Sequence, residues 1–318
     1  MTRRTPGQRV VDGVVDTGLL PDALLRRVIR ILLRRRLREI TAGGLEARDA
    51  RKRALIDTLA NAPVAIETDA ANVQHYEVPT ELFELMLGPH LKYSSGYWPE
   101  GITSLAEAEE AMLRLTCARA ELADGQDVLE LGCGWGSLTL FMAEHYPSSR
   151  ITAVSNSATQ RAYIDARAAS RGLGNVTVLT GDVSRLDEDG FRDGFVHAEA
   201  FDRVVSIEMF EHLRNHRELT RRISGWLRPG GKLFVHVFAH ASDPYTFAAG
   251  SRADWMARHF FSGGLMPSHD LLVMSVRDLQ VEDRWAVSGQ HYARTLHAWL
   301  DRLDQHRDRV LQLFADHP

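Results

Sequence analysis

The sequence predicts an α/β protein built on a doubly wound, mostly parallel sheet. Short apolar segments alternate with helical segments from about residue 127 to residue 238, which is the rhythm of βαβ units. A glycine-rich turn, Gly132-Cys-Gly-Trp-Gly136, follows the first apolar segment, and a polar patch, Glu208-Met-Phe-Glu-His212, follows the fourth. Strands of a parallel sheet present their carboxyl ends at one edge, where such folds bind ligands. Both features are therefore expected at that edge.

The expected elements follow in chain order. Apolar segments of strand length stand at 127–131, 150–154, 176–180, 201–207 and 231–238, and 278–287 is expected to add a strand. Helices are expected at 81–87, 104–121, 137–145, 158–171, from the fourth strand to about 227, and at 291–300. Thr103 or Ser104 is a candidate N-cap for the second of these. Residues at about 240–275 break the rhythm with aromatics, glycines and histidines, and are interpreted as a lid or substrate-facing insertion.

Two helices are expected before this domain, at 22–41 and at about 45–61, so residues 1–65 form a helical extension and residues 66–318 the main domain. The first helix has apolar residues at helical spacing, with arginines between them. One interpretation is a helix that lies on an anionic membrane. The favoured one is a helix that packs on the main domain and exposes its arginines.

Composition excludes several classes of protein. The hydrophobic content of 44% and charged content of 25% are ordinary for a globular protein. A net charge of −4 gives no reason to expect a nucleic-acid partner. No apolar run approaches the length of a membrane span, and the basic start lacks the apolar segment of a signal peptide. Cys117 and Cys133 have neither disulfide-framework nor metal-ligand spacing. A cytoplasmic protein without a metal is expected.

The glycine turn predicts a cofactor pocket. Gly132, Gly134 and Gly136 let a ligand approach the backbone between a strand and a helix. Their spacing is Gly-x-Gly-x-Gly, so the pyrophosphate-binding fingerprint Gly-x-Gly-x-x-Gly is absent. Glu130, just before the turn, suits a positively charged ligand such as the amino-acid end of S-adenosylmethionine.

Polar side chains after the next two strands fit the rest of that ligand. Asn156 or Gln160 can hydrogen-bond ribose hydroxyls, and Asp182 can accept from the exocyclic amine of adenine. Each alone is more often a plain loop residue. Their order behind the glycine turn favours cofactor binding.

The second patch predicts an acid/base cluster. If a helical turn begins after the fourth strand, Glu208, Glu211 and His212 share one face of it. Two carboxylates and an imidazole so close together would titrate as coupled groups, and His suits proton transfer near neutrality. The structural alternative is an acidic pair at a helix start with a capping His. Metal binding is a weaker alternative, because no further ligands stand at suitable spacing.

Four motifs together resemble the cyclopropane-fatty-acid synthase superfamily of S-adenosylmethionine-dependent enzymes: Tyr93-Ser-Ser-Gly-Tyr-Trp98, Leu129-Glu-Leu-Gly-Cys-Gly-Trp-Gly136, Ser206-Ile-Glu-Met-Phe-Glu-His212 and His291-Tyr-Ala-Arg-Thr295. Within it, the chain is most similar to the coclaurine/pavine N-methyltransferase branch. The details are Tyr76-Glu-Val-Pro-Thr80, the Ser206–His212 run, Leu233-Phe-Val-His-Val-Phe238 and Phe260-Phe-Ser-Gly-Gly-Leu-Met-Pro267. The resemblance covers nearly the whole chain.

The resemblance implies a class I, Rossmann-like methyltransferase fold with a seven-stranded, mostly parallel sheet. It implies that Tyr93, Ser94, Gly132, Gly134, Gln160 and Asp182 contact the cofactor, and that Glu208, Glu211 and His212 face an amine. The synthase branch also binds bicarbonate as a base, through a Cys with Glu, His and Tyr partners. Here Ser95 stands in place of that Cys, while Glu211, His236 and Tyr292 match the other positions, which puts cyclopropanation in doubt.

The expected function is S-adenosylmethionine-dependent N-methylation of a small cyclic or ring-bearing amine, with S-adenosylhomocysteine (SAH) as product. His212 is expected to take the proton, Glu208 and Glu211 to orient the amine, and aromatic residues including Tyr97 and Phe260 to wall its ring. One alternative is cyclopropane-fatty-acyl-phospholipid synthesis, with bicarbonate as a possible base, or another lipid methylation; either would use a peripheral membrane contact. Two further alternatives are another small-molecule methylation and a cofactor-binding scaffold without activity. A homodimer is also left open.

Overall fold

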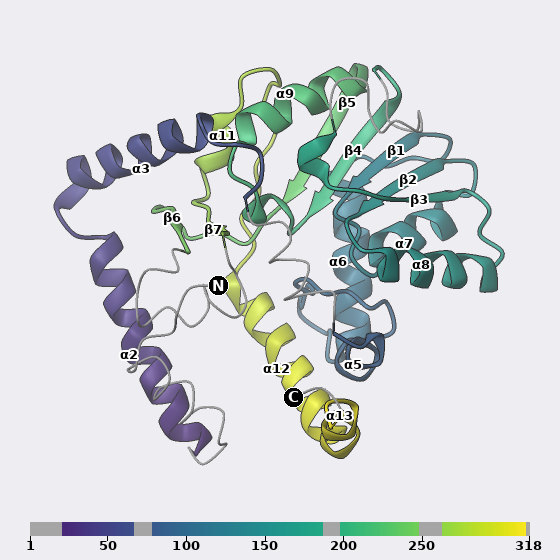
Figure 1. The fold of residues 1–318 in the computed structure, drawn as a ribbon, viewed down its shortest axis with the longest axis horizontal. Helices are drawn as coiled ribbons and strands as arrows, with labels where there is room; N and C mark the ends of the chain where they lie inside the picture. The colour runs from purple at the N-terminus through teal and green to yellow at the C-terminus, as the bar shows by residue number, and fades with distance from the viewer. Residues whose placement is uncertain (1–20, 67–77, 187–197, 248–262, 316–318) are drawn as a thin grey trace.

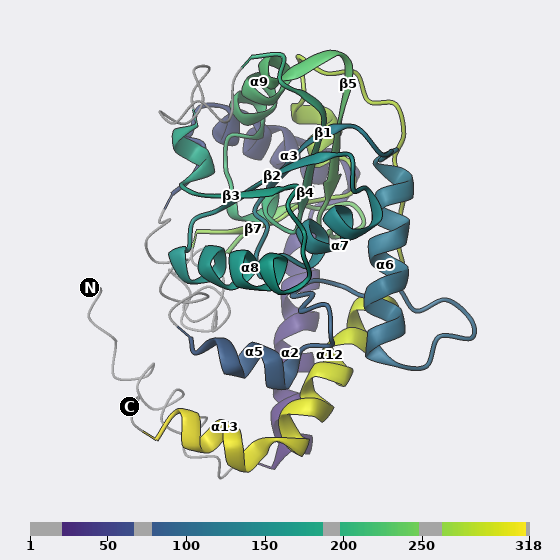
Figure 2. The same cartoon turned by 90° about the vertical axis from the view of Figure 1, so that its right-hand side faces the viewer.

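A computed structural model describes residues 21–66, 78–186, 198–247 and 263–315 (Figures 1 and 2). Its centre is a sheet of five parallel strands in the order β3-β2-β1-β4-β5. The strands are β1 (Asp127–Leu131), β2 (Arg150–Ser155), β3 (Val176–Thr180), β4 (Phe201–Ile207) and β5 (Leu227–His236). The chain winds outward from β1 to β3 and then resumes on the other side of β1. The strand order therefore reverses between β1 and β4, and open α/β sheets bind ligands at such a reversal.

Two cores cover the opposite faces of this sheet. One contains Leu129 and Val204 and is closed by α9 (His216–Trp226). The other contains their chain neighbours Val128 and Val205 and is closed by α6 (Leu105–Arg119) and α7 (Ser137–His145). Adjacent residues of a strand point to opposite faces, so this division shows that helices pack on both sides. The sequence-based prediction of a doubly wound α/β fold is confirmed.

Most predicted elements match the observed ones within a few residues. α6 begins after Ser104, whose hydroxyl accepts from the Glu107 amide in a capping box. α8 (Ala158–Ser170) begins after Ser157 in a similar way. The remaining helices are α2 (Asp22–Ile40), α3 (Gly44–Ala60), α5 (Thr80–Met86), α11 (Leu271–Ser275), α12 (Gly289–Gln305) and α13 (Arg307–Leu313), with 3-10 turns η1 (Val183–Arg185) and η2 (Phe210–His212).

The predicted strand count was wrong for the described part of the chain. Residues 278–287 form no strand, so the main sheet has five strands there instead of seven. Side-chain contacts still hold the segment beside β5: Lys232 pairs with Glu282, and the rings of Phe234 and Trp285 lie 6.3 Å apart. Nearly all of its side chains are exposed, so no buried face selects an extended register.

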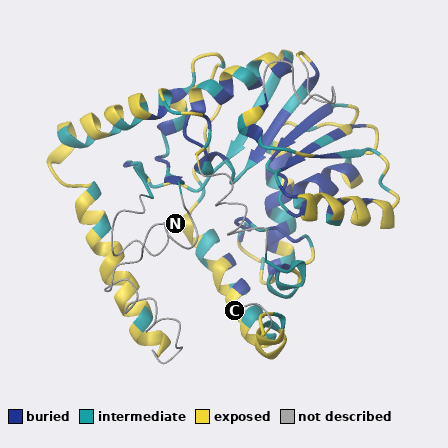
Figure 3. Cartoon of the chain, viewed as in Figure 1, coloured by how far each residue is buried: buried dark blue, intermediate teal, exposed yellow. Residues whose placement is uncertain are grey.

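The favoured interpretation of the first helix was also wrong. No residue of α2 is buried, and the helix projects from the body as an arm (Figures 1 and 3). It still contacts the body where the Arg36 guanidinium lies 5.3 Å from the centre of the Tyr245 ring. The second helix, α3, does pack: Leu59 joins Leu265 and Leu271 in a small core.

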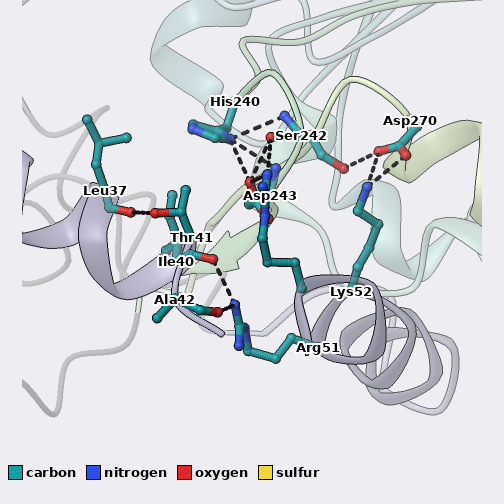
Figure 4. A network of polar contacts seen from close by, with 12 residues as sticks. Leu37, Ile40, Thr41, Ala42, Arg51, Lys52, His240, Ser242, Asp243 and Asp270 are labelled. Carbon is teal, nitrogen blue, oxygen red and sulfur yellow. Dashed lines mark hydrogen bonds and ion pairs between the residues drawn. The ribbon is translucent and has the colours of Figure 1, made fainter. Parts of the chain in front are cut away.

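Ion pairs fix α3 to both ends of the predicted lid insertion (Figure 4). Arg48 binds Asp243 and Ser242, and Lys52, one turn later, binds Asp270. Between these anchors, β6 (Tyr245–Thr246) and β7 (Leu265–Met266) form a short antiparallel pair. Residues 248–262 of the insertion, including Phe260, lie outside the described residues. No described helix combines the length and apolar character needed to cross a membrane.

Candidate active site

The glycine turn joins β1 to α7 at the reversal of strand order. Gly132, Gly134 and Gly136 all have positive φ angles, of 79°, 53° and 79°, which glycine adopts without strain. A Cβ on Gly132 would lie 2.7 Å from Met209, and one on Gly136 would lie 2.6 Å from Ile164. A Cβ on Gly134 would meet no atom within 4 Å. Packing therefore requires two of these glycines, and only Gly134 faces open space.

This difference predicts the stability of two alanine variants. Both Gly134→Ala and Gly136→Ala place a side chain at positive φ, at a cost of about 1–2 kcal/mol. Gly136→Ala also overpacks against Ile164, which adds about 1–3 kcal/mol. Urea unfolding is expected to show the larger loss in the free energy of unfolding for Gly136→Ala. Equal losses in the two variants would contradict this account of the turn.

Glu130, at the end of β1, is a buried carboxyl beside the turn. Among the described residues, the only hydrogen-bond partner of this carboxyl is the Thr139 hydroxyl, which donates to Glu130 Oε2. Burial raises the pKa of Glu130 to about 8, against the smaller lowering by that hydrogen bond. A buried carboxyl with no basic partner among the described residues is chemically suited to a cationic ligand.

The other predicted cofactor residues follow the neighbouring strands. Asn156 comes directly after β2 and is half-buried. Gln160 is buried in the first turn of α8, and its Oε1 accepts from the Ser155 hydroxyl at 2.7 Å. Asp182 follows β3 and accepts from the Ser184 amide at 2.8 Å, so it caps η1. All three stand at the carboxyl edge of the sheet, and their contacts with a cofactor stay a prediction.

Lys92 organises the Tyr93-Ser94-Ser95 loop and was missed by sequence analysis. Its buried Nζ donates to the Ser94 hydroxyl and, at 2.8 Å, to the Ser95 carbonyl. Burial lowers the pKa of Lys92 to about 8, although Glu208 and Glu109 oppose the shift. The available signal was its position: it is one of three lysines in the chain and directly precedes the Tyr93 motif.

Aromatic packing holds the same loop. The Tyr93 ring lies 5.2 Å from Phe83 and 5.5 Å from Trp299, centre to centre. Burial, and then the charge of Glu208, raises the pKa of the Tyr93 hydroxyl to about 12. Tyr97 packs on the ring of His291 at 4.8 Å. Tyr93 therefore stays protonated and neutral throughout the physiological pH range.

Glu208 is the centre of the acid/base cluster. It directly follows β4, and its backbone has a φ of 49° while its N–H donates to the His236 carbonyl. Its Oε1 accepts from the Ser95 amide at 3.1 Å, and its Oε2 accepts from the Tyr292 hydroxyl at 2.9 Å. The His236 Nε2 lies 3.9 Å from Oε1. Burial raises the pKa of Glu208, against the lowering effect of Lys92.

Glu211 lies beside it and is fully buried. Its Oε1 accepts from the Phe238 amide at 3.1 Å, and its Oε2 has no hydrogen-bond partner among the described residues. Burial, and then the charge of Glu208, raises the pKa of Glu211 strongly. Glu211 is therefore held as a neutral acid next to Glu208.

The predicted helical turn through this cluster was wrong. Glu208 adopts a left-handed conformation, η2 covers only Phe210–His212, and α9 begins at His216. Asn215 caps α9, so the cluster is not an acidic pair at a helix start either. A strand-end turn, with β5, α12 and the Tyr93 loop around it, brings the carboxyls together. His212 is half-buried, and its amide closes η2 on the Met209 carbonyl.

His236 and Tyr292 complete the cluster from distant parts of the chain. His236 is the last residue of β5, and burial lowers its pKa to about 3, with Lys92 contributing. Tyr292 lies in the first turn of α12, and burial and Glu208 raise the pKa of its hydroxyl well above the usual value. Both side chains are thus neutral, with Tyr292 a hydrogen-bond donor to Glu208.

The chain is similar to known proteins in sequence and in fold. The family model "Mycolic acid cyclopropane synthetase" matches residues 65–317. The (S)-coclaurine N-methyltransferase of Thalictrum flavum subsp. glaucum is 36% identical over 303 residues, which cover 95% of this chain and 81% of that protein. The cyclopropane-fatty-acyl-phospholipid synthase of Escherichia coli (strain K12) is 30% identical over 252 residues, covering 76% and 60% of the two chains.

A solved structure of coclaurine N-methyltransferase, bound to N-methylheliamine and SAH, superposes with a TM-score of 0.87. It is 37% identical and covers 93% of this chain and 84% of its own. The resemblance found in the sequence motifs is thereby confirmed, as is the Rossmann-like methyltransferase fold. Coclaurine N-methyltransferases are among its relatives, and it is an enzyme with the methyltransferase fold. The chain belongs to the mycolic acid cyclopropane synthetase family.

Proposed function

We propose that the chain is an S-adenosylmethionine-dependent N-methyltransferase that acts on a small cyclic or aromatic-ring-bearing amine of the benzylisoquinoline type. The observation that carries the proposal is the carboxyl pair Glu208–Glu211 at the reversal of strand order, adjacent to the glycine turn. The N-methyltransferases among its relatives match nearly the whole chain.

The residues around the glycine turn fit the methyl donor. S-adenosylmethionine supplies an electrophilic methyl group on a sulfonium, together with an ammonium group, a ribose and an adenine. Glu130 is a buried carboxyl with no basic partner among the described residues, so it can pair with the ammonium group of the ligand. Gly134 leaves room for a ligand at the backbone. Asn156 and Gln160 follow β2, where they can face the ribose, and Asp182 follows β3.

The carboxyl pair fits the methyl acceptor. An aliphatic amine has a pKa of about 10.4 and arrives protonated near neutrality, so it lacks the lone pair that attacks the methyl. An ionised Glu208, held by Tyr292 and Ser95, can bind and orient the ammonium group. Neutral Glu211 leaves Glu208 as the single charge of the pair. His212, on η2, is proposed as the base that takes the proton.

The alternative, cyclopropanation with a bound bicarbonate, does not fit this cluster. A bicarbonate ion would need the donors that Ser95, Tyr292 and His236 direct into the cluster. The Glu208 carboxylate already lies among them, at 3.1, 2.9 and 3.9 Å. A second anion there would meet a like charge in a buried site. The donor set is satisfied by the chain itself, so no bicarbonate-dependent step is proposed.

The direct test measures SAH release with two sets of substrates in parallel. Cyclic and aralkyl secondary amines are offered in one, and unsaturated phospholipid vesicles in the other. We expect amine-dependent turnover that gives a product heavier by one methyl and needs no added bicarbonate. Turnover with vesicles alone, giving a three-membered ring on the acyl chain, would overturn the proposal.

The base assignment has its own prediction. His212→Ala is expected to lower kcat by about 10²-fold, at the low end of the range for loss of a general base. The loss should shrink as the pH rises towards the amine's own pKa, because more amine then arrives unprotonated. SAH affinity, measured by calorimetry, should stay unchanged. Full kcat across pH 6–9 would remove His212 from this role.

A further inference from the structure

Lys92 places a buried positive charge beside the Glu208 cluster. The residue is only 3% exposed, and lysine is almost never fully buried unless it is paired. No carboxylate among the described residues forms an ion pair with Lys92, and its Nζ donates instead to the Ser94 hydroxyl and the Ser95 carbonyl. Burying an ammonium group in this way costs free energy that an apolar side chain of similar length would avoid. The charge itself therefore calls for an explanation.

One residue connects Lys92 to Glu208. The Ser95 carbonyl accepts from Lys92 Nζ at 2.8 Å, and the Ser95 amide donates to Glu208 Oε1 at 3.1 Å. Both groups flank the Cα of Ser95, so the backbone orientation that satisfies Lys92 also directs the amide at Glu208. The same Nζ holds the hydroxyl of Ser94, one of the predicted cofactor contacts. Lys92 thus fixes the loop on the side of the acid/base cluster.

Lys92 also acts on Glu208 through its charge. The titratable groups that face Glu208 come from every element around it: Lys92 and Tyr93 on the loop, Glu211 on the strand-end turn, His236 on β5 and Tyr292 on α12. Burial is the main cause that keeps the other four neutral. Lys92, with a pKa of about 8, is protonated at neutrality. Against the effect of burial, it is the largest influence that lowers the pKa of Glu208.

Glu109, on α6, supports Lys92 from outside this cluster. Its Oε1 accepts from the Gly88 amide at 2.9 Å and its Oε2 from the His90 amide at 3.0 Å, so it holds the chain that leads to Lys92. Burial raises the pKa of Glu109 to about 7, and Lys92 is among the groups that oppose the rise. The charges of Glu208 and Glu109 in turn favour the protonated form of Lys92.

We propose that Lys92 is a positioning residue for the methyl transfer: its ammonium group sets the Ser94–Ser95 backbone against Glu208 and keeps the Glu208 carboxylate ionised. The ammonium group of the methyl acceptor binds the ionised carboxylate, so Lys92 sets the pH above which the acceptor can bind. This consequence rests on the proposed function. The coupling between Lys92 and Glu208 does not, because it exists in the protein without a substrate.

The first test measures the titration of Glu208 without any turnover. Glutamate labelled with 13C at the carboxyl carbon is incorporated, and the Glu208 signal is identified by its absence from Glu208→Gln. A nearby opposite charge typically lowers a carboxyl pKa by about 1–3. In Lys92→Met the midpoint for Glu208 is therefore expected at a pH higher by about one or more. An unchanged or lower midpoint would overturn the proposal, because a loop that merely loosens admits water, which favours the ionised carboxylate.

Three further variants separate the charge from the packing. Lys92→Gln keeps a donor for the loop and lacks the charge, so it should raise the midpoint as Lys92→Met does, and it replaces that variant if Met fails to fold. Thr295→Val loosens the same loop without changing a charge, since the Thr295 hydroxyl accepts from the Gly96 amide and the Trp98 indole. It should not raise the midpoint. Lys232→Met is the matched control, because Lys232 pairs with Glu121 and Glu282 at the surface.

The second test is kinetic. The acid limb of kcat/KM for the amine should move upward with the midpoint for Glu208, so that Lys92→Met lowers kcat/KM by about tenfold or more on the acid side. In a Glu208→Gln background, Lys92→Met should cost little more, because Lys92 acts through Glu208. Equal losses in both backgrounds would overturn the positioning role. A wild type that methylates no amine would reject the proposed function, while the titration of Glu208 still decides whether Lys92 keeps it ionised.

Discussion

Glu208→Gly is expected to lower amine turnover by about 10²–10⁴-fold, and added formate should restore part of it. The carboxylate that holds the ammonium group is removed, and that range is typical of a lost acid/base group. The variant is expected to fold, since Glu208 has a φ of 49° and glycine relieves the strain of that conformation. Its removal leaves the Ser95 amide and the Tyr292 hydroxyl as donors directed into a small cavity.

Glu208→Gln is the matched control for this experiment. It fills the same volume, so formate has no cavity to enter, and its amide carries no charge to attract an ammonium group. We expect low activity that formate does not change. The measurement is kcat/KM for the amine with increasing formate, with acetate as a larger competitor. Rescue of both variants, or of neither while SAH binding is intact, would contradict the geometry assigned to Glu208.

Bicarbonate gives a further outcome in the same assay. If the donors around Glu208 form a general anion site once the carboxylate is gone, bicarbonate should rescue Glu208→Gly as formate does. Wild-type turnover should be indifferent to both ions. Stimulation of the wild type by bicarbonate would show that the Glu208 carboxylate does not replace the ion, and would return the synthase-like reaction to consideration.

The sequence predicted the parts of this fold that local patterns determine. β1, β3, β4 and α7 match their predicted ranges, because apolar runs and glycine turns encode them over a few residues. The predicted strand at 278–287 and the predicted packing of α2 were wrong for a common reason. An apolar pattern shows that a segment has a face to cover, but the partner that covers it, or its absence, is a tertiary property.

In the candidate site too, local motifs identified single residues, whereas their arrangement is a tertiary property. The sequence identified Glu208, Glu211, His236 and Tyr292 separately, through motifs. The pairing of β4 with β5 brings His236 to the two glutamates, and α12 brings Tyr292. The sequence matched Glu211 to the glutamate that partners bicarbonate in the synthases. In the structure, however, Ser95, Tyr292 and His236 are directed at Glu208. Lys92 was missed because a single lysine has no spacing to recognise. The left-handed turn at Glu208 had no signal either, since glutamate rarely adopts positive φ.

Glu130→Gln is expected to weaken SAH binding by about 30- to 1000-fold. The substitution removes one partner of a buried ion pair with the ligand's ammonium group, which costs about 2–4 kcal/mol. The side chain keeps its volume and can still accept from Thr139, so the fold should survive. Calorimetry of SAH binding measures the effect. An unchanged affinity would show that Glu130 does not face the ammonium group.

The pH dependence tests the same contact independently. Burial raises the pKa of Glu130 from its usual value to about 8, so below pH 8 the ligand-free protein holds a proton there. The ammonium group binds the ionised form, and binding must release that proton. SAH affinity should therefore rise with pH between 6 and 7.5. In Glu130→Gln this slope should vanish, and calorimetry in buffers of different ionisation enthalpy should no longer detect the released proton.

Stability should follow the opposite course without the ligand. A carboxyl whose pKa is raised by folding stabilises the folded state fully below its unfolded pKa, and that stabilisation is lost as the pH rises towards 8. Through Glu130, the ligand-free protein becomes less stable across this window while SAH binds more tightly. The increase in Tm on adding SAH should therefore be larger at pH 7.5 than at pH 6. A pH-independent increase in the wild type would mean that Glu130 is already ionised without a ligand, so that a cation from the chain itself compensates its charge.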